Sequence, residues 1–206
     1  MSAVPSQLGS AQPSLCMSEE EFVDWADEDT HAEWVNGKVE LKMPISDVHD
    51  DIQFWLRSLI QSFVDRRSLG KVRGPQFTIR LPQKPSRRDP DLIFVSAGRL
   101  SLMGKTFMDG PADLAIEVVL PDSIARDYRE KYFEYEAAGV REYWIVDPLS
   151  QTTTLHVLDK NGKYEVIAAK EGKLHSVVLN GFWLREADPF KNPLPDVQEL
   201  LTEMPV

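Results

Sequence analysis

Three short apolar runs limit the possible folds of this chain more than any other feature. They are "DLIFV" at residues 91–95, "DLAIEVV" at 113–119 and "EYWIVDP" at 142–148, each too short for a helix. A helical pattern over residues 125–138, ended by Gly139 as its C-cap, separates the last two runs. Strand, helix, strand predicts a right-handed crossover between parallel strands, and therefore an α/β fold with a partly parallel sheet.

The segments before these runs carry local signals of their own. Ser18 and Glu21 form a capping-box pattern that opens a short helix. Asn36-Gly37 lies between two alternating segments and predicts a β-hairpin, because both residues tolerate the positive φ of a type I′ turn. Across residues 50–64, apolar residues recur at helical spacing, which predicts an amphipathic helix.

Alternating segments account for most of the remaining chain. "QFTIRL" predicts a strand that ends at Pro82. After Pro148, the segments "TTTLHVL", "KYEVIA" and "KLHSVVL" predict an antiparallel C-terminal meander.

Length and composition set the class of protein. The chain has 206 residues, of which 42% are hydrophobic and 27% charged, as in a soluble globular protein. We expect a disordered tail over residues 1–16, rich in Ser, Pro and Gln, and a single domain over 17–206. No apolar run approaches the roughly 20 residues of a membrane helix, and the N-terminus lacks a secretory pattern. Cys16 is the only cysteine, which excludes an intramolecular disulfide and a cysteine-based zinc cluster. These features predict a cytoplasmic location.

The charge is distributed unevenly along the chain. The net charge of −10 argues against a protein that coats nucleic acid. Residues 57–88, however, carry nine basic side chains against Asp65 alone, which gives this segment a net charge of +8. Two interpretations remain open: a local surface that faces phosphates, or a solvated basic face that balances acidic neighbours.

One carboxylate interrupts an apolar strand and raises a question of chemistry. Glu117 is flanked by Ile116, Val118 and Val119, and an ionised carboxylate removed from water must be paired or metal-bound. Asp91 opens the preceding apolar run. If the two strands pair, both carboxylates can meet and hold Mg²⁺ or Mn²⁺, which prefer hard oxygen ligands.

Lys131, on the following helix, is the third candidate of this site. A lysine near two metal-binding carboxylates could polarise the attacking water or stabilise charge that develops on a phosphate.

Each candidate also has a simpler structural explanation. Asp91 can cap a turn at the start of its strand, and Glu117 can face water from a half-exposed sheet. Lys131 lies four residues after Asp127, which is the spacing of an ordinary surface ion pair. His49 precedes the long predicted helix, where it can serve the helix start or reach the site. The tyrosines on the helix of Lys131 are expected to pack in the core; they are Tyr128, Tyr132 and Tyr135.

Four segments, in order, resemble the Uma-type restriction-endonuclease-like family of the PD-(D/E)XK nuclease superfamily. The resemblance covers residues 17–201. The segments are "EWVNGKVELKMP", "RRDPDLIFVSAGRL", "PADLAIEVVLPDS" and "ARDYREKYFEYEAAGVREYWIVDP". It implies an α/β fold in which helices flank a mixed, restriction-endonuclease-like β-sheet.

The resemblance also assigns roles to residues. Asp91 and Glu117 match the two acidic metal ligands, and the backbone carbonyl of Val118 would add a third ligand. The superfamily lysine usually lies two residues after the second acid, and Lys131 would replace it from the following helix. Glu33 matches a glutamate that would complete the acidic site through a metal-bound water.

Three positions depart from the family pattern. Leu120-Pro121-Asp122 stands in place of the usual serine-proline-serine, Ala32 in place of a tyrosine, and Asn36 in place of a frequent aspartate. None of these changes removes a proposed ligand, but they leave the substrate contacts open.

The residues and the resemblance together predict two classes of function. The first is a metal-dependent endonuclease that hydrolyses DNA, with Mg²⁺ or Mn²⁺ as cofactor and a homodimer as the working form. The alternative is a catalytically silent nuclease-like fold that acts as a DNA- or protein-binding module. Hydrolysis of RNA or of a small phosphodiester is a third option that the residues leave open.

Overall fold

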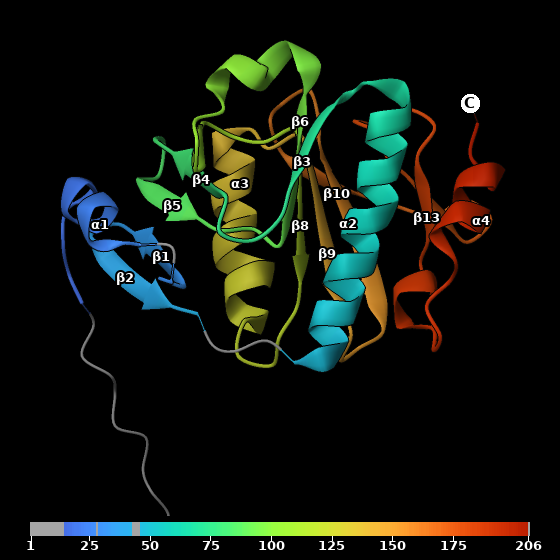
Figure 1. Ribbon diagram of the computed structural model, residues 1–206, viewed down its shortest axis with the longest axis horizontal. Coiled ribbons are helices and arrows are strands. Elements are labelled where there is room, and N and C mark those ends of the chain that lie inside the picture. Colours follow the sequence, from blue (N-terminus) through green and yellow to red (C-terminus); the bar gives the residue numbers. More distant parts are fainter. Residues whose placement is uncertain (1–14, 28, 43–45, 206) are drawn as a thin grey trace, which may run out of the picture.

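A six-stranded mixed sheet forms the centre of the molecule (Figure 1). The structure is a computed structural model that describes residues 15–27, 29–42 and 46–205. In order across the sheet, the strands are β11 (Tyr164–Ile167), β10 (Thr152–Leu158), β9 (Glu142–Asp147), β8 (Leu114–Val118), β6 (Leu92–Ser96) and β3 (Gly70–Arg73). Within this six-stranded sheet, β8 and β9 pair in parallel and the other neighbouring strands pair antiparallel. The crossover predicted between these two strands is therefore confirmed.

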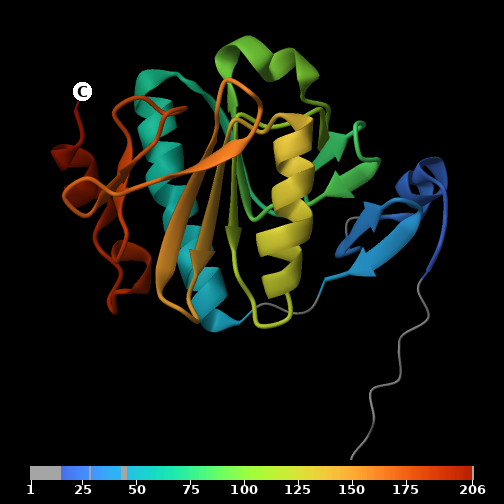
Figure 2. The same cartoon turned by 180° about the vertical axis from the view of Figure 1, so that it is seen from behind.

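Two helices cover opposite faces of this sheet, as Figures 1 and 2 show from the two sides. On one face lies α2 (Asp47–Arg67), which begins after the N-cap Ser46 and is longer than the predicted 50–64. On the other face lies α3 (Tyr132–Ala138), which ends at Gly139 in the left-handed conformation, with φ 89°. The predicted helix over 125–138 is present, and its first part is a π-helical turn, η2 (Arg126–Lys131), that continues directly into α3.

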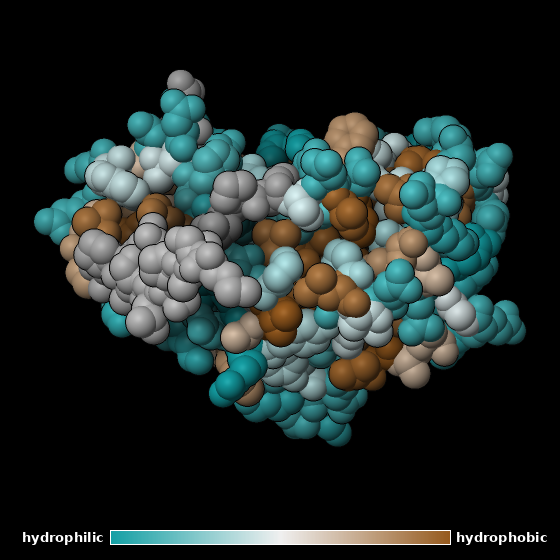
Figure 3. Space-filling model, turned by 90° about the horizontal axis from the view of Figure 1, so that it is seen from below, coloured by the Kyte–Doolittle hydropathy of each residue, from teal (hydrophilic) through white to brown (hydrophobic). Residues whose placement is uncertain are grey.

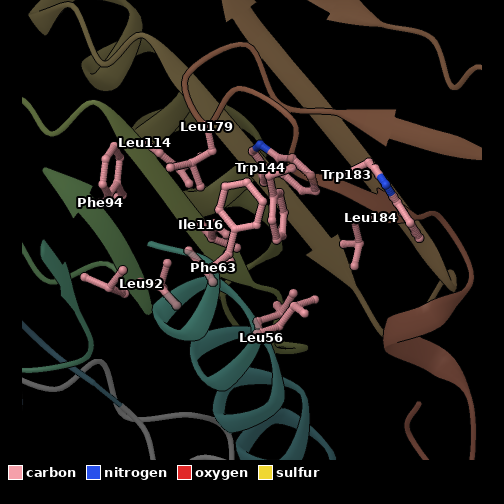
Figure 4. Packing of buried hydrophobic residues seen from close by; sticks show 14 of the residues in the cluster. Leu56, Phe63, Leu92, Phe94, Leu114, Ile116, Trp144, Leu179, Trp183 and Leu184 are labelled. Carbon is pink, nitrogen blue, oxygen red and sulfur yellow. The ribbon is translucent and has the colours of Figure 1, made fainter. Parts of the chain in front are cut away.

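The alternation of side chains along the strands divides the core into two clusters. Leu92 and Ile116 face α2, whereas Ile93 and Ala115 face α3. Figure 4 shows the cluster on the α2 side. Its labelled members are Leu56, Phe63, Leu92, Phe94, Leu114, Ile116, Trp144, Leu179, Trp183 and Leu184. Because both faces of β8 are covered, any polar side chain within it is removed from water.

A smaller sheet extends the α3 side of the molecule. Its strands, in order, are β2 (Lys38–Leu41), β1 (Ala32–Val35), β5 (Ser86–Arg88), β4 (Thr78–Leu81) and β7 (Phe107–Asp109). Asn36 and Gly37 join β1 to β2 with φ of 48° and 85°, which confirms the predicted hairpin. The helix α1 (Glu19–Trp25) has the predicted capping box, and Glu19 binds Arg80 and Arg87.

The C-terminal region differs in part from its prediction. The strands β10 and β11 continue the antiparallel order from β9, as expected. The segment "KLHSVVL" does not join them, because its strand pairs with a later strand in a separate two-stranded sheet. The elements not yet described are η1 (Ala97–Leu102), β12 (Lys173–His175), β13 (Trp183–Arg185), η3 (Asp188–Phe190) and α4 (Val197–Glu203). Leu200 and Leu201 of α4 complete the core on the α2 side.

Most of the tail expected over residues 1–16 lies outside the described residues. Leu15 and Cys16 are described and lie beside β2, where the Leu15 carbonyl accepts a hydrogen bond from Val39 N. In the described part of the chain, none of the helices has the length and apolar character needed to span a membrane. Figure 3 views the molecule from the end at which α2 begins, and hydrophobic residues there lie among hydrophilic ones.

Candidate active site

Glu117 of β8 is buried and paired, which answers the question raised by its sequence. It lies on the α3 face of the sheet and is 2% exposed. Lys131 Nζ lies 2.8 Å from Glu117 Oε2, and the Tyr135 hydroxyl donates a hydrogen bond of 2.9 Å to Oε1. The simpler explanation, a carboxylate that faces water from a half-exposed sheet, is therefore wrong.

Asp91 precedes β6 and is held from the α2 side. Gln53 Nε2 donates to Asp91 Oδ1 at 3.1 Å, and His49 Nε2 lies 3.2 Å from Oδ2. The backbone N–H of Val118 also donates to Oδ2, at 2.7 Å. His49 and Gln53 are one helical turn apart on α2, so the same face of that helix fixes the carboxylate.

The two carboxylates line one cavity of about 480 Å³. Its wall also includes Val118 and Lys131, together with His49. Asp91 immediately precedes β6 and Glu117 lies in β8, and these two strands pair with Leu92 opposite Ile116. The strand pairing on which the predicted convergence of these two carboxylates depends is therefore present.

Lys131 is surrounded by carboxylates at the base of this cavity. Its Nζ lies 3.3 Å from Glu33 Oε1 and 3.5 Å from Asp127 Oδ1, in addition to its contact with Glu117. Burial would lower the pKa of Lys131, but the negative charges of Glu117, Glu33 and Asp127 raise it above its usual value. The pair with Asp127 does form, yet both residues are buried, so it is not the surface pair that the spacing suggested.

Glu33 of β1 lies behind Lys131 and is not among the residues that line the cavity. Arg88 donates a 2.7 Å hydrogen bond to Glu33 Oε2, and the backbone N–H of Asp89 donates to Oε1 at 3.1 Å. Burial would raise the pKa of Glu33, but Lys131 and Arg88 hold it far below its usual value. Its contact with the site runs through Lys131, and its role through a metal-bound water stays a prediction.

The buried carboxylates near the cavity outnumber their cations. Burial raises the pKa of Glu117 to about 8 in spite of Lys131, and the charges of Asp91, Asp127 and Glu33 add to the rise. For Asp91 the balance is reversed. Burial would raise its pKa, but the hydrogen bond from His49 and the charge of Lys42 lower it. The excess negative charge is therefore relieved at Glu117, by a proton or by a bound cation.

This donor set fits a hard divalent cation. Asp91, Glu117 and the carbonyl group of Val118 belong to residues at the cavity wall, and Mg²⁺ commonly uses few protein oxygens and keeps several waters. Asp127 Oδ1 is buried and accepts no hydrogen bond from a described residue. Over the described ranges, no three His, Cys, Asp or Glu side chains form a metal-holding group, so the proposed set depends on the backbone carbonyl and on water.

Several residues of the site were missed or only partly foreseen from the sequence. Gln53 gave no signal beyond its position one turn after His49. Tyr135 was expected to pack and does so, but its hydroxyl also binds Glu117. His49 fulfils both roles left open for it: its N–H donates to the N-cap Ser46, and its ring reaches Asp91.

In the basic segment 57–88, three arginines bind carboxylates of the protein. Arg80 and Arg87 bind Glu19 of α1. Arg88 is buried, and its guanidinium pairs with Glu33 and Glu134. For these arginines, the interpretation that basic residues balance acidic neighbours is confirmed.

A mixed sheet flanked by helices is the architecture of restriction-endonuclease-like α/β proteins. Residues 19–187 match the profile of the Uma2 family, which is described as "Putative restriction endonuclease", and the chain belongs to this family. This membership supports a nuclease-like function.

A solved structure shows the same fold. It is titled as a "putative nuclease belonging to DUF820", from Anabaena variabilis. The two chains superpose with a TM-score of 0.71 at 18% sequence identity, over 83% of this chain and 96% of the other. A search of the curated proteins gave no match.

Proposed function

We propose that this protein is a divalent-metal-dependent endonuclease that hydrolyses phosphodiester bonds of DNA. The observation that carries the proposal is the pair of buried carboxylates, Asp91 and Glu117, at one cavity with Lys131. The excess of carboxylates over cations there favours a bound cation. Membership of a nuclease-like family supports the same reaction class.

Each residue has a defined task in this proposal. Asp91, Glu117 and the Val118 carbonyl hold Mg²⁺ or Mn²⁺. When bound, such an ion supplies an activated water and neutralises charge on the phosphate. Lys131 presents its ammonium group to the scissile phosphate, and Glu33 keeps that group charged and in place. His49 and Gln53 fix the orientation of Asp91.

The test removes one carboxylate without a change of shape. Asp91→Asn should reduce Mn²⁺-dependent cleavage of plasmid DNA by at least about 10³-fold, since the metal contributes several kcal/mol to the transition state. Asp147→Asn is the matched control, because Asp147 is equally buried, at 7% exposure, but lies away from the cavity wall. This control should cut at the wild-type rate.

Two results would refute the proposal. One is a folded, metal-loaded wild-type protein that cuts neither single- nor double-stranded DNA. The other is an Asp91→Asn variant that cuts as fast as the wild type while circular dichroism shows both proteins folded.

One observation favours a second candidate, a catalytically silent module that binds DNA or protein. Both carboxylates already accept hydrogen bonds from protein donors, Asp91 from Gln53 and Glu117 from Tyr135. If the protein is a silent module, the wild type and the Asp91→Asn variant should bind the partner with equal affinity.

The proposal also includes a homodimer, because cleavage of two DNA strands favours two paired sites. Sedimentation equilibrium of the purified chain measures the mass directly, and a monomer at all concentrations would remove this part of the proposal.

A further inference from the structure

Arg126 is a cation at the cavity that forms no ion pair with the described residues. It opens the π-helical turn η2, and its side chain lines the same cavity as Asp91 and Glu117. Its Nε is buried, yet it finds no hydrogen-bond acceptor within residues 15–27, 29–42 and 46–205. Within those same ranges, no carboxylate lies close enough to form an ion pair with it. A buried donor without a partner is unfavourable, so this arrangement needs an explanation.

Two other cations of the cavity wall, Lys131 and Lys42, form ion pairs with carboxylates. Lys131 contacts three carboxylates. Lys42 Nζ lies 3.0 Å from Asp89 Oδ2 and also donates to the Asp89 carbonyl at 2.8 Å. Among the lysines and arginines that line the described part of the cavity, Arg126 is therefore the one that forms no ion pair with a carboxylate.

The local backbone explains why Arg126 lies here. In a π-helical turn the hydrogen bonds run from residue i to i+5, which brings the first and last residues of η2 to one side. Arg126 and Lys131 both line the cavity for this reason. Such turns are rare and often mark functional sites.

We propose that Arg126 binds a backbone phosphate of the DNA substrate, an inference that rests on the function proposed above. The guanidinium group is a planar fork of donors that matches phosphate oxygens. The carboxylates of the cavity repel an anionic substrate, so a phosphate that enters is stabilised by a cation that forms no close ion pair with them. Arg126 supplies that cation beside the carboxylates, where it sets the position of the strand.

The experiment measures binding separately from cleavage. A fluorescein-labelled DNA duplex is titrated with the full chain in Ca²⁺, by fluorescence anisotropy, over a series of salt concentrations. Arg126→Ala should weaken binding about tenfold, as expected for one lost charge-assisted contact. The slope of log K against log salt should fall by about 0.9, the value for one phosphate. Arg126→Lys should keep the slope, because the charge remains, and recover part of the affinity.

A matched control lies on the same helical turn. Arg129 is exposed and does not line the cavity, so Arg129→Ala should leave affinity and slope unchanged. Inorganic phosphate serves as a second probe. It should compete with DNA more weakly in Arg126→Ala than in the wild type.

The outcomes separate this inference from the proposed function. If the wild type cuts DNA and Arg126→Ala binds with the wild-type affinity and slope, the inference is wrong while the nuclease function stands. If Arg126→Ala loses affinity and slope although no protein cuts DNA, the phosphate site stands and the nuclease function fails. A wild type that binds no DNA overturns both.

Discussion

Two buried glutamates in neighbouring strands give the clearest comparison within this molecule. Glu117 lies in β8 and Glu142 in β9, and the two strands pair in parallel. Both side chains are almost fully buried, at 2% and 0% exposure. They lie on opposite faces of the sheet. Glu117 shares its face with Ala115 toward α3, and Glu142 shares its face with Trp144 toward α2.

Their partners differ in charge. Among the described residues, the donors to Glu142 are neutral, and they include the Trp144 indole at 2.6 Å and the backbone N–H groups of Val177 and Val178 at 2.8 and 2.9 Å. Glu117 contacts Lys131 and lies among other carboxylates at the edge of a cavity, whereas Glu142 does not reach that cavity. Burial of a carboxylate in a strand therefore does not identify a site. A buried carboxylate identifies a site when its charge is unbalanced and it lies beside an open cavity.

The largest expected effect is on catalysis. Glu117→Gln should reduce Mn²⁺-dependent DNA cleavage by at least about 10³-fold, because it removes a metal ligand. Glu142→Gln should cleave within about twofold of the wild type, since a conservative change away from the reacting groups leaves the barrier intact. Plasmid nicking at equal protein concentration measures both. Equal losses in the two variants would remove the functional distinction between these glutamates.

For stability, we expect the larger effect from Glu142→Gln and the smaller one from Glu117→Gln. Glu142→Gln should lower the free energy of unfolding by about 2 kcal/mol, because the new amide N–H₂ group must face one of the donors that Glu142 binds, and that donor then has no acceptor. Glu117→Gln in the metal-free protein should cost less than about 1 kcal/mol, since the protonated form of Glu117 has nearly the same shape and hydrogen bonds. Urea denaturation with EDTA at pH 7 measures both values. A loss for Glu117→Gln as large as that for Glu142→Gln would show that Glu117 is chiefly structural.

Sequence reasoning reached the elements whose signals are local. The hairpin at Asn36-Gly37, the capping box at Ser18 and the crossover from β8 to β9 were all predicted from short patterns. Glu117 stood out because it interrupts an apolar run. Glu142 did not, because it stands at the start of one.

The remainder depends on contacts between distant segments. Gln53 reaches Asp91 across 38 positions of the chain, and Arg88 joins Glu33 across 55. The π-helical turn that brings Arg126 to the cavity has no signature in the sequence. The segment "KLHSVVL" alternates like a strand of the meander, but its strand β12 pairs with β13, a partner that the sequence did not predict.

The last prediction concerns the pH dependence of stability and of metal binding. The pKa of Glu117 is about 8 in the folded protein, against 4.5 for an unperturbed glutamate. Folding of the metal-free protein therefore takes up a proton between these values. The stabilisation from this group is complete below pH 4.5 and is lost as the pH rises through 8, by at most about 1.4 kcal/mol per pH unit.

A bound cation must displace that proton, so metal binding should strengthen as the pH rises toward 8. The increase in melting temperature on addition of Mn²⁺ should accordingly be larger at pH 8 than at pH 6, both in the wild type and in Glu142→Gln. In Glu117→Gln the increase should be small at both pH values, because the ligand and its proton are both absent. The burial of Glu142 also raises its pKa, but this carboxyl lies away from the cavity, so its titration adds the same pH dependence with and without Mn²⁺. If the increase in melting temperature of the wild type is equal at pH 6 and pH 8, Glu117 binds no metal. The contact with Lys131 would then be the one remaining difference between the two glutamates.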